Sequence, residues 1–371
     1  MKFKKTIILA FILTVNLQGF SQEVLTKKEA LRITLANNFG IKIANNNLET
    51  AKNNSSIYNT GLLPTATLSS GASFRRDNQT ITRQDASATS ISGAITKSYN
   101  ASVNLNYILF DGLGRKYNYQ QLKETYNLTA LQARETIENA YVQLFTAYFQ
   151  IARLSENKNN LTEALSISKR RLQRATYQYE YSQSTKLDLL SAEVDVNNDR
   201  LNLINAVQQL SNAKRGLNLI LGVEKEVIYD VETGVDFNEF LNLKELQQKT
   251  TAKNISLKQR EKNIAISEFN IKISKANYLP SLGLNTSYGW NQSENPATSF
   301  LAGSTSNGLN AGLSLSWNLF DGGATKTRVA NAKIALENQQ IGLEQQKVIV
   351  ENNLKNTWEN YKNQRFILKT H

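Results

Sequence analysis

Few residues in this chain could carry out covalent chemistry. The only histidine is the last residue, His371, and there is no cysteine. A Ser-His-Asp or Cys-His arrangement cannot be built from this set, and zinc sites mostly need several such ligands. The lack of cysteine also excludes disulfides, iron–sulfur clusters and lipid attachment at a cysteine. We therefore expect no catalytic, cofactor-binding or metal-binding residue, and no enzyme activity.

Two aspartates stand out because they recur in one short motif. Asp111 belongs to a Leu-Phe-Asp-Gly sequence, and Asp321 belongs to the same sequence 210 positions later. Aspartate side chains often hydrogen-bond the backbone of a turn, and glycine accommodates the positive φ that turns can require. We interpret Asp111 and Asp321 as turn-capping residues rather than acid–base catalysts, with Gly112 and Gly322 in the turns that follow.

The formal net charge of +12 and the isoelectric point of about 9.5 suggest at first a nucleic-acid partner. Three of the positive charges, Lys2, Lys4 and Lys5, lie in an initial stretch without acidic residues. The other basic residues are scattered among acidic ones, whereas a phosphate-binding surface requires a basic patch. We expect no nucleic-acid partner and interpret the charge as a mixed, solvated helical surface.

Residues 1–21 have the composition of a secretory signal peptide. The early lysines are followed by an apolar run over residues 6–17, and Gly19 and Ser21 supply small residues before a cleavage site. The apolar run is too short to span a bilayer as a helix. We expect the mature chain to begin after Ser21 and to be exported.

The chain contains an internal duplication. Leu-Pro occurs at 63–64 and again at 279–280, and Leu-Phe-Asp-Gly occurs at 109–112 and again at 319–322. In each copy a predicted helix leads to Leu-Pro, two strands follow, and more helix comes after Phe-Asp-Gly. We divide the chain into a signal peptide (1–21), a first repeat (22–222), a linker (223–241) and a second repeat (242–371).

Alternating apolar and polar residues predict a β-hairpin in each repeat. The clearest strands are expected over residues 99–110 and 309–320, with partners over 65–74 and 282–290. One face of each clear strand is apolar, and the other carries asparagine, serine and glycine without charge. This pattern fits a tilted membrane strand of about 9–11 residues beside a water-filled lumen better than a soluble hairpin.

The two ends of each hairpin differ in composition. The polar stretches 75–98 and 291–308 are expected to be loops on the outside, because outer-membrane barrels carry their longer loops there. Pro64 and Pro280 mark the other end, where helix gives way to strand, because proline cannot continue helical hydrogen bonding. This end is expected to face the periplasm.

A long helix and its return are predicted after the first hairpin. From residue 113 to residue 181 there is no proline, and apolar residues recur at three- and four-residue spacing, as in a coiled coil. The pattern breaks at 181–186 and restarts as an apolar row formed by Leu187, Leu190, Val194, Leu201 and Ile204. Ser184 or Thr185 is expected to cap the returning helix, with Asp188 near its N-terminal end. We expect a helical hairpin tip here, which is a natural docking point for a partner.

Together these features resemble the TolC-like outer membrane efflux family. The resemblance rests on the duplicated helix–strand–strand–helix unit, with Leu-Pro before each first strand and Leu-Phe-Asp-Gly after each second strand. The segments 25–31 and 184–193 also look like the family pattern. The resemblance runs from about Leu25 to the C-terminus, and the order and duplication of the motifs make it specific.

The resemblance implies a mixed α and β membrane protein that acts as a homotrimer. Four strands per chain would form a twelve-stranded β-barrel in outer-membrane lipid, continued across the periplasm by an α-helical barrel of long coiled-coil hairpins. The function implied is a passive export duct for small molecules or polypeptides in a tripartite efflux or type I secretion system. Its partners would be a periplasmic adaptor protein and an inner-membrane pump of RND, ABC or MFS type, with no cofactor.

The sites that follow from this interpretation lie at one tip and at the strand–helix junctions. The adaptor-docking tip would comprise Ser182, Gln183, Ser184, Thr185, Lys186, Leu187 and Asp188. The junctions would be formed by Pro64, Asp111, Gly112, Pro280, Asp321 and Gly322.

The trimer can also be argued from strand number. Four strands cannot close a barrel, and single-chain outer-membrane barrels begin at eight strands. A dimer would give eight strands and a lumen filled by side chains, whereas three chains give twelve strands and a wider lumen. Either closed ring removes the unpaired strand edges that lipid does not tolerate.

The second repeat departs from the first. Relative to Gly222 in the first repeat, about 60 residues, including a second tip and its return helix, have no counterpart, so no entrance-gate residue can be assigned. Tyr181 also stands where many family members have glycine. Alternatives are therefore a non-functional truncated remnant, or a surface or periplasmic coiled-coil protein such as a trimeric adhesin. The adhesin would place all four strands together at the C-terminus, whereas here they lie in two pairs.

Overall fold

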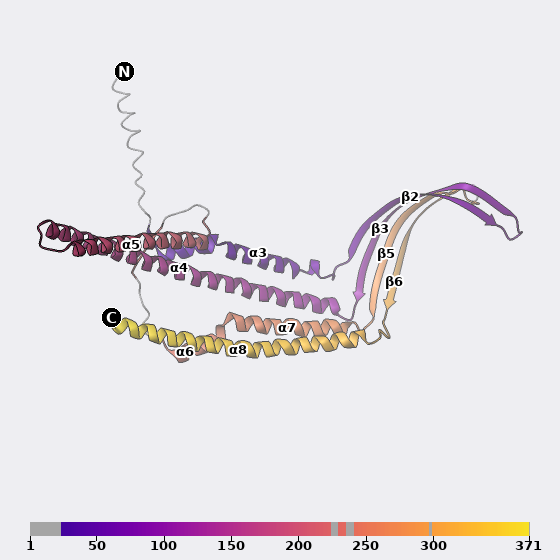
Figure 1. Ribbon diagram of the computed structural model, residues 1–371. Coiled ribbons are helices and arrows are strands. Elements are labelled where there is room, and N and C mark those ends of the chain that lie inside the picture. Colours follow the sequence, from indigo (N-terminus) through magenta and orange to yellow (C-terminus); the bar gives the residue numbers. More distant parts are fainter. Residues whose placement is uncertain (1–23, 224–228, 235–240, 297–298, 371) are drawn as a thin grey trace, which may run out of the picture. The chain divides into compact units, whose positions relative to one another are not determined.

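The computed structural model describes residues 24–223, 229–234, 241–296 and 299–370 (Figure 1). The expected signal peptide and part of the expected linker lie outside these ranges.

The chain forms two compact units, and only the second combines segments from both repeats. Within the described residues, the first unit lies in 24–46 and 132–241, which belong to the first repeat and the linker, and the second lies in 47–131 and 242–370. Helices α3 (Phe39–Asn54) and α4 (Gly114–Glu180) contribute to both units.

The second unit contains a four-stranded antiparallel sheet (Figure 1). In spatial order its strands are β2 (Thr65–Thr82), β3 (Ala88–Phe110), β5 (Ser281–Glu294) and β6 (Gly303–Ser316). The two predicted hairpins are both present. They form one sheet because β3 of the first hairpin pairs with β5 of the second.

Strands β2 and β3 are longer than the alternation predicted, and the loop expected over residues 75–98 is wrong. The two strands stay paired as far as Thr82 and Ala88, so only residues 83–87 form the turn. The alternation disappears in this stretch because a two-stranded ribbon with both faces largely exposed needs no apolar face. The loop expected over 291–308 is also too long, since pairing continues to Glu294 and Gly303.

The β2–β3 hairpin extends beyond the β5–β6 hairpin. The outermost pair that joins the two hairpins is Lys97 with Glu294, whose Nζ and Oε2 atoms lie 3.0 Å apart. Beyond this pair the two-stranded ribbon continues alone, with a register shift next to Asn78. The Asn78 Oδ1 atom accepts a hydrogen bond of 2.9 Å from the backbone N–H of Gly93. Such bulges bend the strands that contain them.

The last predicted strand is too long at its C-terminal end. Strand β6 ends at Ser316, four residues before the expected boundary at Phe320. Trp317, the next residue, donates a hydrogen bond of 3.0 Å from Nε1 to the carbonyl oxygen of Tyr278. The chain therefore leaves the sheet after Ser316 and turns towards Tyr278, which directly precedes the Leu-Pro of the second repeat.

Helices complete the second unit. They are α6 (Leu243–Lys253), α7 (Ile255–Ala276), α8 (Ala324–Thr370) and the first part of α4, with a 3-10 turn at Ile57–Asn59. Helix α7 packs along α8. It also contacts α4, because Lys262 Nζ lies 2.8 Å from Glu124 Oε2. No helix in the described residues is both long enough and apolar enough to cross a membrane.

The first unit is built on the two long helices that follow the first hairpin. The expected helix over 113–181 is α4, and its return is α5 (Lys186–Leu221); α2 (Lys27–Asn37) packs against α5. A short parallel pair, β1 (Val24–Leu25) with β4 (Asp230–Val231), lies in the same unit. The largest fully buried apolar side chains of its core are Leu144, Tyr148, Ile151, Leu217 and Leu221.

The apolar row that the sequence suggested for α5 faces outward. Leu187, Leu190, Val194, Leu201 and Ile204 are all exposed in the chain. Helix α5 instead buries a different row, Val196, Ala206, Leu210, Leu217 and Leu221. The helix therefore has two apolar rows, and apolar spacing alone does not tell which row meets α4.

Candidate functional site

The four-stranded sheet has one apolar face. The pairing register aligns Leu68 with Val103, Val103 with Tyr288, and Tyr288 with Leu309, so these side chains project from the same side. All four are more than half exposed. Residues of the same register on this face are Ala66, Ala72, Ala101, Leu105, Leu284, Ala311, Leu313 and Leu315. An exposed apolar surface of this extent marks contact with lipid or protein.

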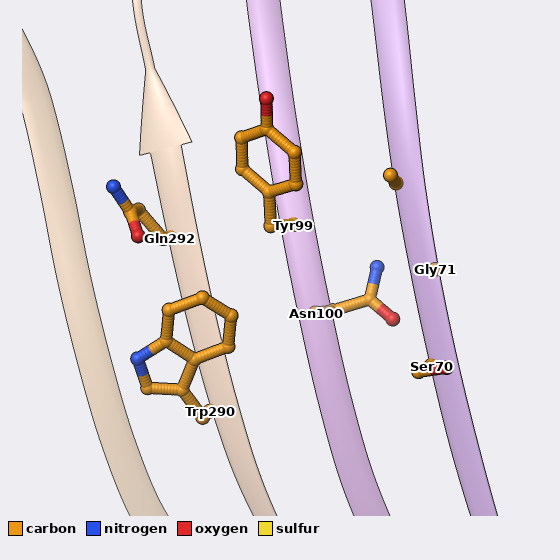
Figure 2. A pocket seen from close by; sticks show the side chains of 7 residues that line it. Ser70, Gly71, Tyr99, Asn100, Trp290 and Gln292 are labelled. Atoms are coloured by element: carbon orange, nitrogen blue, oxygen red, sulfur yellow. The ribbon is translucent and has the colours of Figure 1, made fainter.

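Aromatic side chains bound this apolar face at both ends. Tyr99 and Trp290, on neighbouring strands, lie towards the turns and border a shallow pocket with Ser70 and Gly71 (Figure 2). Tyr107 lies on the same face near the junctions. At about 3.3 Å per residue and a tilt of about 40°, the eight steps from Tyr99 to Tyr107 span about 20 Å, somewhat less than the height of about 25 Å of an outer-membrane apolar band.

Charged residues begin just beyond Tyr99 and Trp290, on the side of the hairpin turns. Lys97 and Glu294 form their ion pair on the same face as Tyr99, and Lys97 lies two residues before Tyr99 on β3. The register places no charged residue on this face between Lys97 and Tyr107. An uncharged band between aromatic rows is the pattern of a membrane-facing strand surface.

The opposite face of the sheet is polar and uncharged. Asn100 is paired with Asn291, and Asn106 is paired with Asn285. A pocket on this face is lined by Asn104, Asn106, Asn285, Thr286, Ser287, Asn310 and Gly312. Such a face is suited to contact with water.

The outer edges of the sheet are open. Strands β2 and β6 each have one partner, and among the described residues no strand pairs with their other edges. The unpaired N–H and C=O groups of an edge strand need a partner wherever water is excluded.

The two strand–helix junctions use the predicted capping residues. Asp111 Oδ2 accepts a hydrogen bond of 2.9 Å from the N–H of Arg115. Asp321 Oδ2 accepts one of 2.8 Å from the N–H of Thr325, at the equivalent place in the second repeat. Gly112 and Gly322 have φ values of +67° and +65°. Pro64 and Pro280 directly precede strands β2 and β5.

The first junction contains a side chain that the sequence analysis missed. Arg115 donates to Asp111 Oδ2 from Nε at 3.1 Å, and to the carbonyl oxygens of Gly61 and Ile108 at 2.5 Å each. It thus ties the loop before β2, the end of β3 and the start of α4 together. The sequence does contain a signal for this contact, because Arg115 follows Asp111 by four residues, about one turn of a helix. Thr325 occupies the equivalent position in the second repeat, where Arg328 lies 3.8 Å from Asp321.

The tip between α4 and α5 is ordered by a capping box. Thr185 caps α5: its hydroxyl accepts a hydrogen bond of 3.2 Å from the Asp188 N–H, and the Asp188 carboxylate accepts one of 3.1 Å from the Thr185 N–H. The hydroxyl groups of Ser184 and Thr185 also donate to Asp188 Oδ2. These bonds, with the Thr185 hydroxyl first, lower the pKa of Asp188.

The other tip residues are available at the surface. Ser182 has a left-handed φ of +54°, so the position that favours glycine is Ser182 and not its neighbour Tyr181. Gln183 and Lys186 are exposed, and Leu187 is 75 % exposed. Because the carboxylate of Asp188 is engaged in the capping box, the tip presents the Gln183 amide, the Lys186 ammonium and the apolar Leu187 side chain to solvent.

No group of three or more histidine, cysteine, aspartate or glutamate side chains is placed to hold a metal ion in the described part of the chain.

Comparison with known proteins gives a consistent relationship. The family model described as outer membrane efflux protein matches residues 30–223 and 246–364. The outer membrane protein TolC of Vibrio cholerae is 22 % identical over 276 residues, which cover 74 % of this chain and 60 % of that protein. This chain therefore spans about 60 % of the length of that relative.

Two solved structures illustrate the shared fold. The Campylobacter jejuni CmeC outer membrane channel matches with a TM-score of 0.70 and 16 % identity, over 87 % of this chain and 67 % of that chain. The open state of the Neisseria gonorrhoeae MtrE outer membrane channel matches with a TM-score of 0.61 and 17 % identity, over 92 % and 74 %. The family match covers both repeats, and the protein lies in the outer membrane. The chain belongs to the outer membrane efflux protein family.

Proposed function

We propose that this chain is the protomer of a passive channel through the outer membrane, serving efflux or type I secretion. The observation that carries the proposal is the sheet, with an apolar face bounded by Tyr99 and Tyr107, a polar face lined by asparagine, and two open edges. A sheet with these three properties is suited to a wall between lipid and water, provided that other copies complete its edges.

The proposed assembly is a homotrimer. Strand β6 of one copy would pair with β2 of the next, and three copies would close a twelve-stranded barrel. This number leaves a lumen wide enough for cargo, whereas eight strands would fill it with side chains. The polar faces would line the lumen, and the apolar faces would contact outer-membrane lipid.

The proposed role needs no chemistry in this chain. An inner-membrane pump of RND, ABC or MFS type would supply the energy, and a periplasmic adaptor would join the pump to this channel. The adaptor would dock at the tip formed by Ser182, Gln183, Ser184, Thr185, Lys186, Leu187 and Asp188. The exposed Leu187 side chain and the rigid capping box at Thr185 support this role, because a fixed surface with an apolar anchor loses little entropy on binding.

Disulfide cross-linking between open edges tests the channel proposal. The chain has no cysteine, so every introduced pair is free of background. We would combine Ser69→Cys on β2 with Asn310→Cys, Gly312→Cys or Ser314→Cys on β6, all on the polar face. The expected result is a ladder that ends at a covalent trimer in outer membranes. A series of cross-linked products that ends at the dimer contradicts the proposal. The absence of cross-linked product with every cysteine pair also contradicts it.

Cross-linking at the tip tests the docking role separately. Gln183→Cys is expected to form a disulfide-linked or reagent-linked product with a co-expressed periplasmic adaptor, and to stay unreactive towards thiol reagents added outside intact cells. The matched position Thr162→Cys lies on α4 well before the tip and is expected to give much less adaptor product. Labelling of Gln183→Cys from outside would place the tip on the wrong side of the membrane.

A further inference from the structure

Helix α4 carries a basic stretch shortly before the tip. Residues 164–179 include Lys169, Arg170, Arg171 and Arg174 and contain no aspartate or glutamate. All four basic side chains are exposed, and none forms an ion pair with another described residue. Four neighbouring cations without a partner repel one another, and a bound anion would relieve that repulsion.

Two of these arginines lie on the face of α4 that points away from α5. At 3.6 residues per turn, Arg170, Arg174, Tyr177 and Tyr181 fall on one side of the helix. Leu165 and Ser168 fall on the opposite side and are buried. The Ser168 hydroxyl donates a hydrogen bond to the Asp199 carboxylate of α5, which fixes that side as the one facing α5.

The two tyrosines continue the arginine line to the tip. Tyr177 is 53 % exposed and Tyr181 is 76 % exposed. Tyr181 follows the end of α4, and its N–H still donates a hydrogen bond of 3.0 Å to the Tyr177 carbonyl oxygen. We call Arg170, Arg174, Tyr177 and Tyr181 the α4 stripe.

The far side of α5 is chemically different from the α4 stripe. It carries Leu187, Leu190, Val194 and Leu201, all exposed, and no carboxylate is part of that row. A second copy laid stripe against stripe would place arginine against arginine. A second copy laid with its α5 row against the stripe would desolvate the arginines without supplying an anion. Neither of these two arrangements supplies a carboxylate to the guanidinium groups.

We propose that the α4 stripe is a docking surface for an α-helix of a partner protein that presents carboxylates at four-residue spacing. Arg170 and Arg174 are separated by one turn, about 6 Å along the axis, which is the separation of glutamates at i and i+4 on a helix lying alongside. Guanidinium groups bind carboxylates in a planar, two-bond geometry. The inference deepens the proposed function, since it states the chemistry of the adaptor surface that would contact this channel beside the tip.

The tyrosines favour a protein helix over an anionic lipid as the occupant. Tyrosine and arginine are the residue types that carry most binding energy at protein interfaces, where each buries apolar area around a polar contact. A lipid headgroup would use the arginines and would leave Tyr177 and Tyr181 without a role. The straight line of the four residues also matches the side of a helix.

A peptide-binding measurement tests the proposal with the full-length chain in detergent. The probe is a fluorescent helical peptide of about 20 residues that has glutamates at i, i+4 and i+8 on one face. Its controls are the same peptide with glutamine at those positions, and a permuted peptide with the glutamates spread around the helix. The expected result, at about 0.05 M salt, is binding about tenfold tighter for the one-face glutamate peptide than for either control, with most of the difference lost at about 0.5 M.

Variants of the chain make the test specific. Arg170→Glu/Arg174→Glu should lose the preference for the glutamate peptide and gain one for a peptide with lysines at the same positions. Tyr177→Ala should weaken binding several-fold without changing its salt dependence. The matched control Lys326→Glu/Lys333→Glu makes the same charge change at exposed positions on α8 and should have no effect.

Equal affinity for the glutamate and glutamine peptides would overturn the inference, and so would equal affinity for the one-face and permuted peptides. The inference would also be overturned if the α8 control variant lost the preference for the glutamate peptide as fully as Arg170→Glu/Arg174→Glu. Binding to phosphatidylglycerol vesicles but not to the glutamate peptide would assign the stripe to lipid instead. Each of these outcomes leaves the edge and tip cross-linking results untouched, so the channel proposal stands or fails by its own tests.

Discussion

The hydroxyl group of Tyr148 donates a hydrogen bond of 2.6 Å to the carbonyl oxygen of Leu25, 123 positions earlier in the chain. The same oxygen atom of Tyr148 accepts a hydrogen bond of 3.1 Å from the N–H of Glu232. One fully buried side chain on α4 therefore holds both the first described strand and the segment after α5. Burial raises the pKa of this phenol above its ordinary value, so it stays a neutral donor across the physiological range.

Removing this hydroxyl should destabilise the first unit. Tyr148→Phe keeps the ring but leaves the Leu25 carbonyl and the Glu232 N–H without their partner, at an expected cost of about 1–3 kcal/mol. Denaturant unfolding in detergent measures the loss. Tyr141→Phe removes the same atom from a half-exposed ring on the same helix and should change stability by less than about 0.5 kcal/mol. Equal effects of the two changes would remove the special role of Tyr148.

The tip should loosen in acid. Hydrogen bonds from Thr185 and Ser184 hold the pKa of Asp188 below its ordinary value of 3.8. The carboxylate therefore stabilises the tip fully above that ordinary value, and this contribution is lost as the pH falls through the lowered folded-state pKa. Hydrogen exchange of residues 181–186, corrected for intrinsic rates, should accelerate below about pH 4. In Asp188→Asn this acceleration of exchange in acid should be absent. If it persists in that variant, another titrating group causes it.

Ser182 should be improved by glycine. Its φ of +54° is in the left-handed region, where a side chain other than glycine costs about 1–2 kcal/mol. Ser182→Gly should therefore stabilise the hairpin by up to about 1 kcal/mol, since part of the gain is offset by a more flexible unfolded chain. Tyr181→Gly should destabilise it, because φ at that position is not positive. Thermal unfolding of the two variants gives the comparison, and the reverse order would contradict the backbone assignment.

The two junction glycines should differ in their tolerance of a methyl group. Both have positive φ, but a Cβ atom on Gly112 would lie 2.5 Å from the carbonyl oxygen of Ala276, whereas one on Gly322 would meet nothing within 4 Å. Gly322→Ala should cost about 1 kcal/mol from backbone strain alone, and Gly112→Ala should cost clearly more. Yield of folded protein and denaturant unfolding measure both, and similar losses would indicate that the contact at Ala276 is easily relieved.

Charge on the apolar face should prevent insertion. Leu105→Arg places a guanidinium inside the uncharged band, and Leu315→Arg places one on the same face just beyond the level of Tyr107. The expected cost is about 2–4 kcal/mol near the middle of a membrane and smaller towards its edge. The matched changes Asn104→Arg and Ser314→Arg lie on the polar face of the same strands. Recovery of trimer from outer membranes should fall for the first pair only. Full tolerance of both leucine changes would contradict the lipid-facing assignment.

Features that depend on a few neighbouring residues could be predicted from the sequence. The caps at Asp111, Asp321 and Thr185 each involve partners within four positions, and the positive φ of Gly112 and Gly322 follows from the same turns. The two hairpins were predictable because apolar residues recur at every second position along their clearest strands.

Features that depend on distant partners could not be predicted. The hydrogen bond of Tyr148 to Leu25 joins parts of the chain that no local pattern connects. The strand from Arg75 to Thr82 lacks alternation because solvent covers both its faces, so its composition is that of a loop. Helix α5 has two apolar rows, and only packing decides which row α4 covers. The tip and junction assignments to partners stay predictions.

The unequal lengths of the two hairpins have a consequence for the cell surface. Beyond the pair of Lys97 with Glu294, the β2–β3 ribbon continues alone for about 25 Å at about 3.3 Å per residue. In the proposed orientation this ribbon stands above the lipid headgroups, and the β5–β6 hairpin stays near their level. Large molecules approaching the cell would then meet residues 75–96 first. We expect sequence changes to be tolerated more readily on this ribbon than in the band beneath it, which stays under the constraint of lipid.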